Sequence, residues 1–201
     1  MFEIIAVTNR GCCPEGRGFA EQVARIAAAG VDKVILREKD LTPEAYEKLA
    51  RQILKACEDS GAELLLHRFT AVADAMGHAK IHLPLPVLEE APGLRRQFET
   101  IGVSVHSLEQ ARRALSLGAD YLSAGHVFAT DCKKGLPPRG LGFLSEICSE
   151  MPIPVYAIGG ISAANIQRVQ EAGAAGACVM SGIMESESPE AYVSALLQKI
   201  G

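Results

Sequence analysis

The sequence lacks the features that mark several classes of protein. No apolar run approaches the roughly 18 residues of a membrane-spanning helix. Its 20 Lys and Arg against 24 Asp and Glu give a net charge of −4, without the basic excess typical of nucleic-acid binding. The start, MFEIIAVTNR, has no charged n-region and no small-residue cleavage site, so we expect no signal peptide. Six cysteines show no disulfide framework. We expect a cytoplasmic protein with reduced thiols and no membrane or nucleic-acid partner.

Recognisable metal-ligand spacing is also missing. Three histidines, His67, His82 and His126, are expected near strand ends, but no short His-x-His pair occurs. The adjacent Cys12 and Cys13 have no second pair at ligand spacing. From these patterns we expect neither a metal nor a cofactor.

What the sequence does contain is one unit repeated along its length, a short apolar run followed by a stretch of helical period. Several runs are apolar without alternation, which suits strands buried on both faces of a parallel sheet. The eight runs are Ile4–Thr8, Lys33–Arg37, Glu63–His67, Lys80–Leu83, Thr100–Ser104, Tyr121–Ala124, Pro154–Ile158 and Ala177–Ser181. Eight evenly spaced units favour a closed (β/α)₈ TIM barrel, an α/β fold, over an open doubly wound sheet. We expect a single domain over residues 1–201.

Helix signals fall between these runs. Thr42-Pro43-Glu44 reads as an N-cap, an N1 proline and an acidic first turn, and the helix is expected to end at Gly61. The helices after the third and fourth runs are expected to be short. The other expected helices are Phe19–Ala29, Ser107–Leu117, Ser162–Ala172 and one opened by Ser188-Pro189-Glu190.

Functional side chains of such a barrel follow the carboxyl ends of its strands. After the seventh and eighth strands come Gly159-Gly160 and Ser181-Gly182. Glycines let a backbone approach a ligand, and loops seven and eight are a common phosphate site in this fold. We therefore expect these four residues to bind a phosphate group.

The second strand runs into the four charged residues Arg37-Glu38-Lys39-Asp40. Alternation along an extended chain sends neighbouring side chains in opposite directions. Arg37 and Lys39 are therefore candidates to face an anionic substrate, with Glu38 balancing them; the alternative is a solvated turn.

The segment 125–140 is the longest loop between the predicted strands and helices and is expected to be a binding loop. His126 follows the sixth strand directly, where a histidine could accept and donate a proton. Lys133, Lys134 and Arg139 supply positive charge for a carboxylate or phosphate. A Cys132–His126 nucleophile pair has no supporting signature. The residues alone thus predict a soluble barrel enzyme that moves a proton on a small phosphorylated, carboxylated molecule, with metal-requiring synthase chemistry as the alternative.

Five segments together resemble the thiamine-phosphate synthase superfamily, over essentially the whole chain. They are Leu36-Arg37-Glu38-Lys39-Asp40, Gly102-Val103-Ser104-Val105-His106-Ser107, Gly118-Ala119-Asp120-Tyr121, Ala157-Ile158-Gly159-Gly160-Ile161 and Val179-Met180-Ser181-Gly182-Ile183. Within it, the run from Gly125 to Leu136 resembles the thiazole tautomerase (TenI-type) branch, because the synthase typically has Pro where this chain has His126.

The chain departs from the synthase pattern at the magnesium site that the resemblance implies. That enzyme ionises a pyrimidine diphosphate with Mg²⁺ held by two aspartates. One aspartate follows an Asn after the third strand, where this chain has His67-Arg68. The other lies shortly after the His-Leu of the fourth strand, where His82-Leu83 continues into Pro84-Leu85-Pro86-Val87. Without those oxygen ligands we expect synthase activity to be absent or very weak.

The resemblance then implies a thiazole tautomerase of thiamin biosynthesis, an isomerase. It would convert 2-carboxy-4-methylthiazol-5(2H)-ylidene ethyl phosphate to its aromatic tautomer. His126 would be the catalytic acid and base. Lys133, with Thr130 nearby, would bind the carboxylate, and backbone N–H groups at Gly159, Gly160, Ser181 and Gly182 would hold the phosphate. Arg37, Lys39 and Arg68 would line the half of the mouth that holds the pyrimidine diphosphate in the synthase.

Two alternatives stay open beside this interpretation. One is a Mg²⁺-dependent thiamine-phosphate synthase, and the other is a non-catalytic regulatory protein that binds thiazole phosphate. All three bind a phosphorylated small molecule and differ in magnesium dependence and turnover. Because exposed helix faces of barrels often form dimers, we also expect a homodimer.

Overall fold

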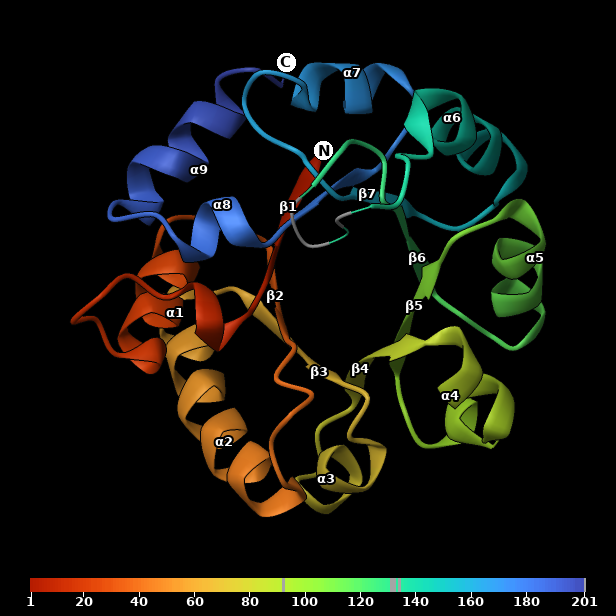
Figure 1. Cartoon of the computed structure of the whole chain (residues 1–201). Helices are drawn as coiled ribbons and strands as arrows, with labels where there is room; N and C mark the ends of the chain where they lie inside the picture. The colour runs from red at the N-terminus through yellow and green to blue at the C-terminus, as the bar shows by residue number, and fades with distance from the viewer. Residues whose placement is uncertain (92, 131–132, 134, 201) are drawn as a thin grey trace.

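The computed structural model describes residues 1–91, 93–130, 133 and 135–200. Eight parallel strands form a closed barrel in chain order, and β1 pairs with both β2 and β8 to close the ring. Figure 1 looks along the barrel, with the strands at the centre and the helices outside them. The strands are β1 (Glu3–Val7), β2 (Lys33–Leu36), β3 (Glu63–His67), β4 (Lys80–Pro84), β5 (Thr100–Val105), β6 (Tyr121–Gly125), β7 (Val155–Ile158) and β8 (Gly176–Val179). The predicted α/β barrel is confirmed.

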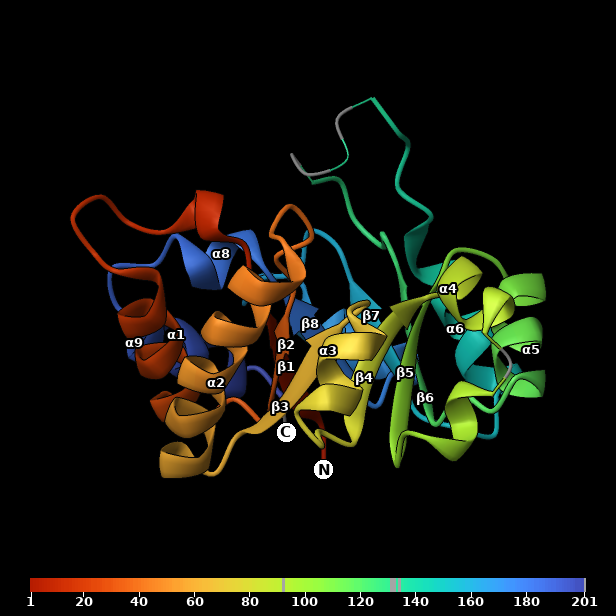
Figure 2. The same ribbon diagram turned by 90° about the horizontal axis from the view of Figure 1, so that it is seen from below.

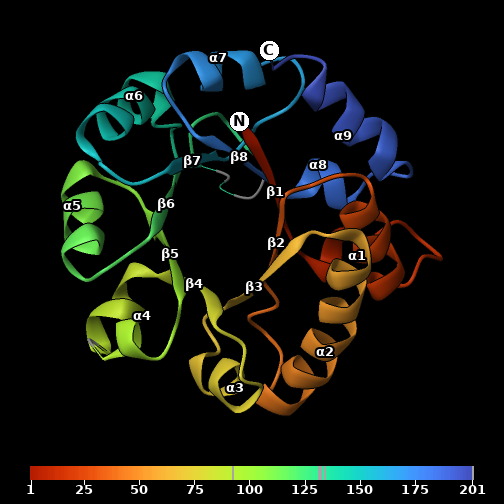
Figure 3. The same cartoon turned by 180° about the vertical axis from the view of Figure 1, so that it is seen from behind.

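The helices surround the strands on every side, as the view from behind in Figure 3 also shows. They are α1 (Phe19–Ala28), α2 (Pro43–Ser60), α3 (Thr70–Ala75), α4 (Leu85–Glu90), α5 (Leu108–Ser116), α6 (Gly140–Glu150), α7 (Ile166–Glu171), α8 (Ser181–Met184) and α9 (Pro189–Leu197), with short 3₁₀ turns at Arg10–Cys12 (η1) and Leu94–Arg96 (η2). None of the described helices is long and apolar enough to cross a membrane.

The signals at the ends of α2 act as predicted. The Thr42 side chain accepts a hydrogen bond from the backbone N–H of Ala45, Pro43 occupies the first turn, and Gly61 follows with a φ of +79°. The helices after β3 and β4 are short, also as predicted. α7 begins at Ile166 rather than Ser162, because Asn165 first forms a turn in which its side chain accepts from the N–H of Ser162.

Strand alternation sorts the apolar residues into two buried layers. On β1, Ile4 and Ala6 pack in the large cluster between sheet and helices, while Ile5 and Val7 belong to a smaller cluster inside the barrel. Tyr121 and Tyr156 also belong to the inner cluster. The inner cluster fills the barrel below its mouth, so polar side chains at the strand ends lie on a packed floor.

The predicted eighth strand is too long. The strand ends at Val179, and Ser181 already begins the single turn of α8. Residues 181–182 therefore form part of the rim of the barrel.

Candidate active site

A cavity of about 480 Å³ opens at the carboxyl ends of the strands. All nine predicted site residues line it: Arg37, Lys39, His126, Thr130, Lys133, Gly159, Gly160, Ser181 and Gly182. They come from β2, β6, β7 and β8 and the segments that follow them. Figure 2 shows the connection from β6 to α6 rising above the barrel at this end. Cys132 lies outside the described residues.

The first feature of the rim is a glycine cradle, defined as Gly159, Gly160, Ser181 and Gly182. Gly159 has a φ of +101° and Gly160 a φ of +66°, a region that side chains rarely adopt. A Cβ on Gly159 would lie 2.4 Å from the Cβ of His126, and one on Gly160 would lie 2.4 Å from the carbonyl oxygen of Ala129. Glycine is therefore required at both positions, and the cradle stays open to a ligand.

Backbone hydrogen bonds join this cradle to the start of the β6–α6 connection. Val127 donates to the Ile158 carbonyl over 2.9 Å, and Phe128 donates to the Gly159 carbonyl over 3.0 Å. The far end of the connection returns to the same place, since Arg139 donates to the His126 carbonyl over 3.0 Å. His126 is thereby held beside the cradle.

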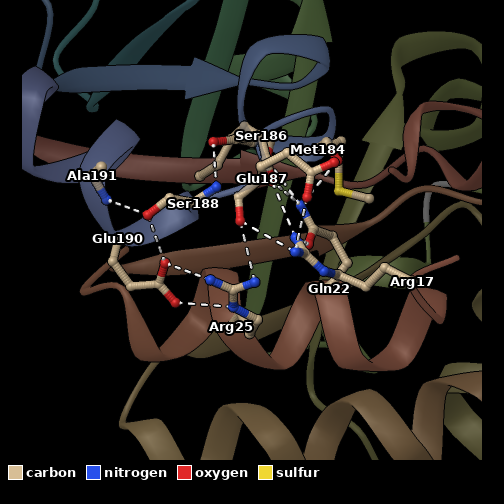
Figure 4. Close-up of polar contacts among 10 residues, drawn as sticks. Arg17, Gln22, Arg25, Met184, Ser186, Glu187, Ser188, Glu190 and Ala191 are labelled. Atoms are coloured by element: carbon tan, nitrogen blue, oxygen red, sulfur yellow. Dashed lines mark hydrogen bonds and ion pairs between the residues drawn. The ribbon is translucent and has the colours of Figure 1, made fainter. Parts of the chain in front are cut away.

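A buried amide from α1 fixes the chain that leaves the cradle. Gln22 is fully buried, and its Nε2 donates to the carbonyls of Met184 and Ser186, both at 3.0 Å, and to that of Ile183 at 3.4 Å. Arg17 donates to the Gln22 Oε1 over 2.8 Å, which sets the orientation of the amide. Figure 4 shows both side chains, and Arg25 beside them, directed at this segment. We call Gln22 with these partners the α1 staple.

The second feature is a cationic rim, defined as Arg37, Lys39 and Arg68. All three line the cavity, and none forms an ion pair with another described residue. No aspartate or glutamate is among the described residues that line the cavity. This rim therefore presents positive charge that no described carboxylate of the cavity lining neutralises.

Glu38 does not balance these cations as predicted. Its carboxylate is buried on the other side of the chain, where it accepts from Thr8 Oγ1 at 2.7 Å and from Arg10 Nε at 3.1 Å. Asp40 also pairs with Arg10, at 2.6 Å. Arg37 and Lys39 therefore face the cavity while both acids turn to Arg10, as alternation predicted, although β2 itself ends at Leu36.

Tyr46 of α2 ties together the two strands below the cationic rim. Its buried hydroxyl donates to the Leu36 carbonyl over 2.6 Å and accepts from the His67 backbone N–H over 2.8 Å. Arg68 follows with a φ of +59°, and its N–H donates to the His82 carbonyl. The turn that presents the Arg68 side chain is therefore fixed from two sides.

A polar layer containing buried histidines forms the floor between these features. Tyr121 Oη lies 2.9 Å from His82 Nδ1, and Ser104 Oγ lies 2.8 Å from His82 Nε2. A buried phenol needs an acceptor for its proton, so we assign the Tyr121 hydroxyl as donor to Nδ1, which places the His82 proton on Nε2. Ser123 Oγ also approaches Ser104 Oγ, at 3.1 Å.

Both floor histidines are neutral at physiological pH. Burial and the charge of Arg37 lower the pKa of His82 to about 3. Burial, and after it the charges of His82, Arg37, Arg68 and Lys39, lower the pKa of His67 to about 3. The positive charges of the cationic rim thus add to burial in lowering the pKa values of these histidines.

Ser123 is a cavity residue that the sequence interpretation missed. It lies within β6 and was counted only as part of a strand, although the inward parity of Tyr121, Ser123 and Gly125 marks it as a floor position. The α1 staple and the Arg10–Glu38 pair were also missed, since they join segments far apart in the sequence and no local pattern signals them.

The residues present do not fit a resident divalent metal. The resemblance to synthases implies two carboxylates near the ends of β3 and β4, and the chain has His67-Arg68 and Pro84 to Val87 there. The described part of the chain holds no cluster of three or more His, Cys, Asp or Glu side chains able to bind a metal ion. Magnesium prefers oxygen ligands, and the cationic rim offers nitrogen cations instead.

The family model and relatives that are 34 % and 36 % identical in sequence point to one family. The family described as thiamine monophosphate synthase (TMP-TENI) matches residues 4–183. A thiamine-phosphate synthase of Syntrophomonas wolfei is 34 % identical, covering 98 % of this chain and 95 % of the relative. A putative thiamine-phosphate synthase of Geobacter sulfurreducens is 36 % identical, covering 98 % and 93 %. Thiamine phosphate pyrophosphorylase from Pyrococcus furiosus superposes with a TM-score of 0.83 at 28 % identity, covering 98 % and 95 % of the two chains.

These comparisons contradict the predicted reaction. The relatives are named as synthases, which are transferases, and none of those above is named a thiazole tautomerase. The prediction of an isomerase was wrong, and the alternative of a thiamine-phosphate synthase is the better supported. The prediction failed because it gave the absent carboxylates and His126 more weight than the similarity over the whole chain.

Proposed function

The chain belongs to the thiamine monophosphate synthase family, and we propose that it joins a thiazole phosphate to a pyrimidine carried on pyrophosphate, forming thiamine phosphate. One observation carries this proposal. A single cavity has a glycine cradle on one arc of its rim and a cationic rim on another. A reaction between a monophosphate and a diphosphate needs two such anion sites on one cavity.

The glycine cradle suits the monophosphate of the thiazole. Its backbone is held open by the positive φ angles of Gly159 and Gly160, and exposed N–H groups on such a turn favour an anion. His126 and Lys133 line the adjoining wall and contact the thiazole end of the substrate in this proposal. Thr130 lies on the same wall.

The cationic rim suits the diphosphate of the pyrimidine. In the proposed reaction the bond from the pyrimidine methylene carbon to pyrophosphate breaks, and the thiazole nitrogen forms a bond to that carbon. Pyrophosphate takes the electron pair as it leaves. Arg37, Lys39 and Arg68 stabilise the charge that develops on it, since preorganised cations act where charge appears in the transition state.

The test is turnover of the wild-type chain with both substrates. Thiamine phosphate would be measured by chromatography and pyrophosphate by ³¹P NMR, in buffers with EDTA and with Mg²⁺. Product under either condition supports the proposal. Arg37→Gln should lower turnover by about 10-fold or more, whereas Arg112→Gln, which alters a surface pair with Glu150, should not.

Absence of product under both conditions would contradict the synthase proposal. If thiazole phosphate still bound, the chain would be a phosphate-binding protein without this activity. Isothermal titration with thiazole phosphate distinguishes that outcome from an inactive preparation.

A further inference from the structure

We infer that the cationic rim binds a diphosphate directly, without a divalent cation. This inference rests on the proposed function for the identity of the ligand, but its binding test is independent of turnover. Sites that hold pyrophosphate through Mg²⁺ need carboxylates to hold the metal. This cavity has none among its described lining residues.

Three cationic side chains gather on this side of the cavity. Arg37 directly follows β2, Lys39 lies in the turn after it, and Arg68 follows the neighbouring strand β3. The two acids closest to them in sequence, Glu38 and Asp40, are both occupied by Arg10. A divalent cation such as Mg²⁺ would therefore meet three like charges in this rim. A polyanion would meet three opposite charges.

Arg68 is the residue of the cationic rim that follows β3. Its backbone is in the left-handed region at a φ of +59°, and the hydrogen bond from its N–H to His82 holds it there. A residue other than glycine with a positive φ is uncommon and is retained where the surroundings impose it. The turn keeps an exposed guanidinium at the cavity mouth, where it can make two hydrogen bonds to a phosphate.

The floor beneath the rim is compatible with direct binding. His67 and His82 are neutral, so they add no positive charge to that of Arg37, Lys39 and Arg68. Ser104 and Ser123 supply hydroxyl groups beside them. These groups can hydrogen-bond an anion whose charge is met by the rim.

Isothermal titration of the wild-type chain with inorganic pyrophosphate tests the inference. We expect binding in EDTA, and we expect added Mg²⁺ to weaken the apparent affinity, because the metal complexes free pyrophosphate in solution. A metal-dependent site would show the opposite sign. Affinity should also fall as salt rises, because exposed charges are screened.

Arg68→Asn is the matched variant, because Asn tolerates a positive φ and removes only the long cation. It should weaken pyrophosphate binding about 10-fold, the size of one lost hydrogen bond to a charged group. Arg112→Gln, on the outer helix α5, should leave it unchanged. Circular dichroism melting of both variants checks that each is folded.

Two results would overturn the inference: pyrophosphate binding that requires Mg²⁺, or equal affinity in wild type and a folded Arg68→Asn variant. Binding of pyrophosphate in EDTA without any turnover would retain this inference and remove the synthase proposal. Turnover together with pyrophosphate binding that requires Mg²⁺ would do the reverse.

Discussion

At the β7–β8 rim the cavity is bordered mainly by glycine backbone, whereas at the β2–β3 rim it is bordered by long cationic side chains. The glycine cradle depends on conformations that only glycine adopts easily and on a buried amide from α1. The cationic rim depends on charge, and Tyr46 joins the two strands beneath it. Backbone sites tolerate little change in shape, while side-chain sites tolerate shape changes but not loss of charge.

The largest effect should come from adding one methyl group to the cradle. Gly159→Ala would strain a φ of +101° and place a carbon 2.4 Å from the Cβ of His126. We expect thiazole-phosphate affinity to fall about 100-fold, corresponding to about 3 kcal/mol of strain and displacement. Isothermal titration measures it.

Gly142→Ala is the control for this prediction, because a Cβ there would meet nothing within 4 Å. Gly142 lies in α6. The Gly142→Ala variant should bind thiazole phosphate with wild-type affinity and should be slightly more stable than wild type, because alanine favours a helix over glycine. Equal affinity of Gly159→Ala and wild type would show that the cradle does not bind the phosphate.

The α1 staple should be the next most sensitive feature. Gln22→Leu keeps the volume but leaves the carbonyls of Met184 and Ser186 without this donor and Arg17 without its Oε1 acceptor. We expect the free energy of unfolding to fall by about 3 kcal/mol, since each buried orphaned polar group costs about 1–3 kcal/mol. Urea unfolding measures it.

Ligand affinities of the folded Gln22→Leu protein provide a second measurement on this variant. If the staple positions the cradle, thiazole-phosphate affinity should fall while pyrophosphate affinity stays unchanged. A parallel loss at both sites would show only general destabilisation. Arg25→Ala, which removes an exposed pair with Glu190, should change stability by less than about 1 kcal/mol.

Acidification should lower the free energy of unfolding through the buried His82 in the floor of the cavity. The folded-state pKa of His82 is about 3, below the ordinary value of 6.5, so the unfolded chain takes up the proton first as pH falls. Its contribution to stability is therefore present above pH 6.5 and is lost as the pH falls toward 3. Between pH 7 and pH 5 we expect a loss of about 2 kcal/mol from this residue, measured by urea unfolding.

His82→Gln should reduce that pH dependence by about 2 kcal/mol between pH 7 and pH 5, and His67, whose pKa is also lowered to about 3, should account for the slope that remains. The Gln side chain can accept from Tyr121 and donate to Ser104 as the neutral imidazole does, but it does not titrate. An unchanged slope between pH 7 and pH 5 would mean that His82 is not the group responsible.

Tyr46→Phe should have a smaller effect than Gly159→Ala, Gln22→Leu or the pH change that acts through His82. It removes one hydroxyl and leaves the Leu36 carbonyl and the His67 N–H without their shared partner. We expect a loss of about 1–2 kcal/mol in the free energy of unfolding. Pyrophosphate affinity should fall more than thiazole-phosphate affinity; the reverse order would contradict the role given to Tyr46.

The same contrast explains what could be predicted from sequence. The barrel and the cradle follow local rules, because apolar runs, helix caps and glycines act on their own neighbourhood. Arg37 and Lys39 were placed by strand alternation. The burial of Glu38 against Arg10, and the reach of Gln22 to Ser186, depend on contacts between distant segments. The reaction was mispredicted because individual residues were weighed against a similarity that spans the chain.

In the proposed function one cavity holds two separate anions, and simultaneous binding tests this most directly. Thiazole phosphate would be titrated into wild-type protein already saturated with inorganic pyrophosphate in EDTA, with calorimetry as the readout. The account predicts that one thiazole phosphate still binds per chain, with an affinity close to that measured without pyrophosphate. Competition, with thiazole-phosphate binding abolished at saturating pyrophosphate, would mean that both anions use one site and would contradict the account.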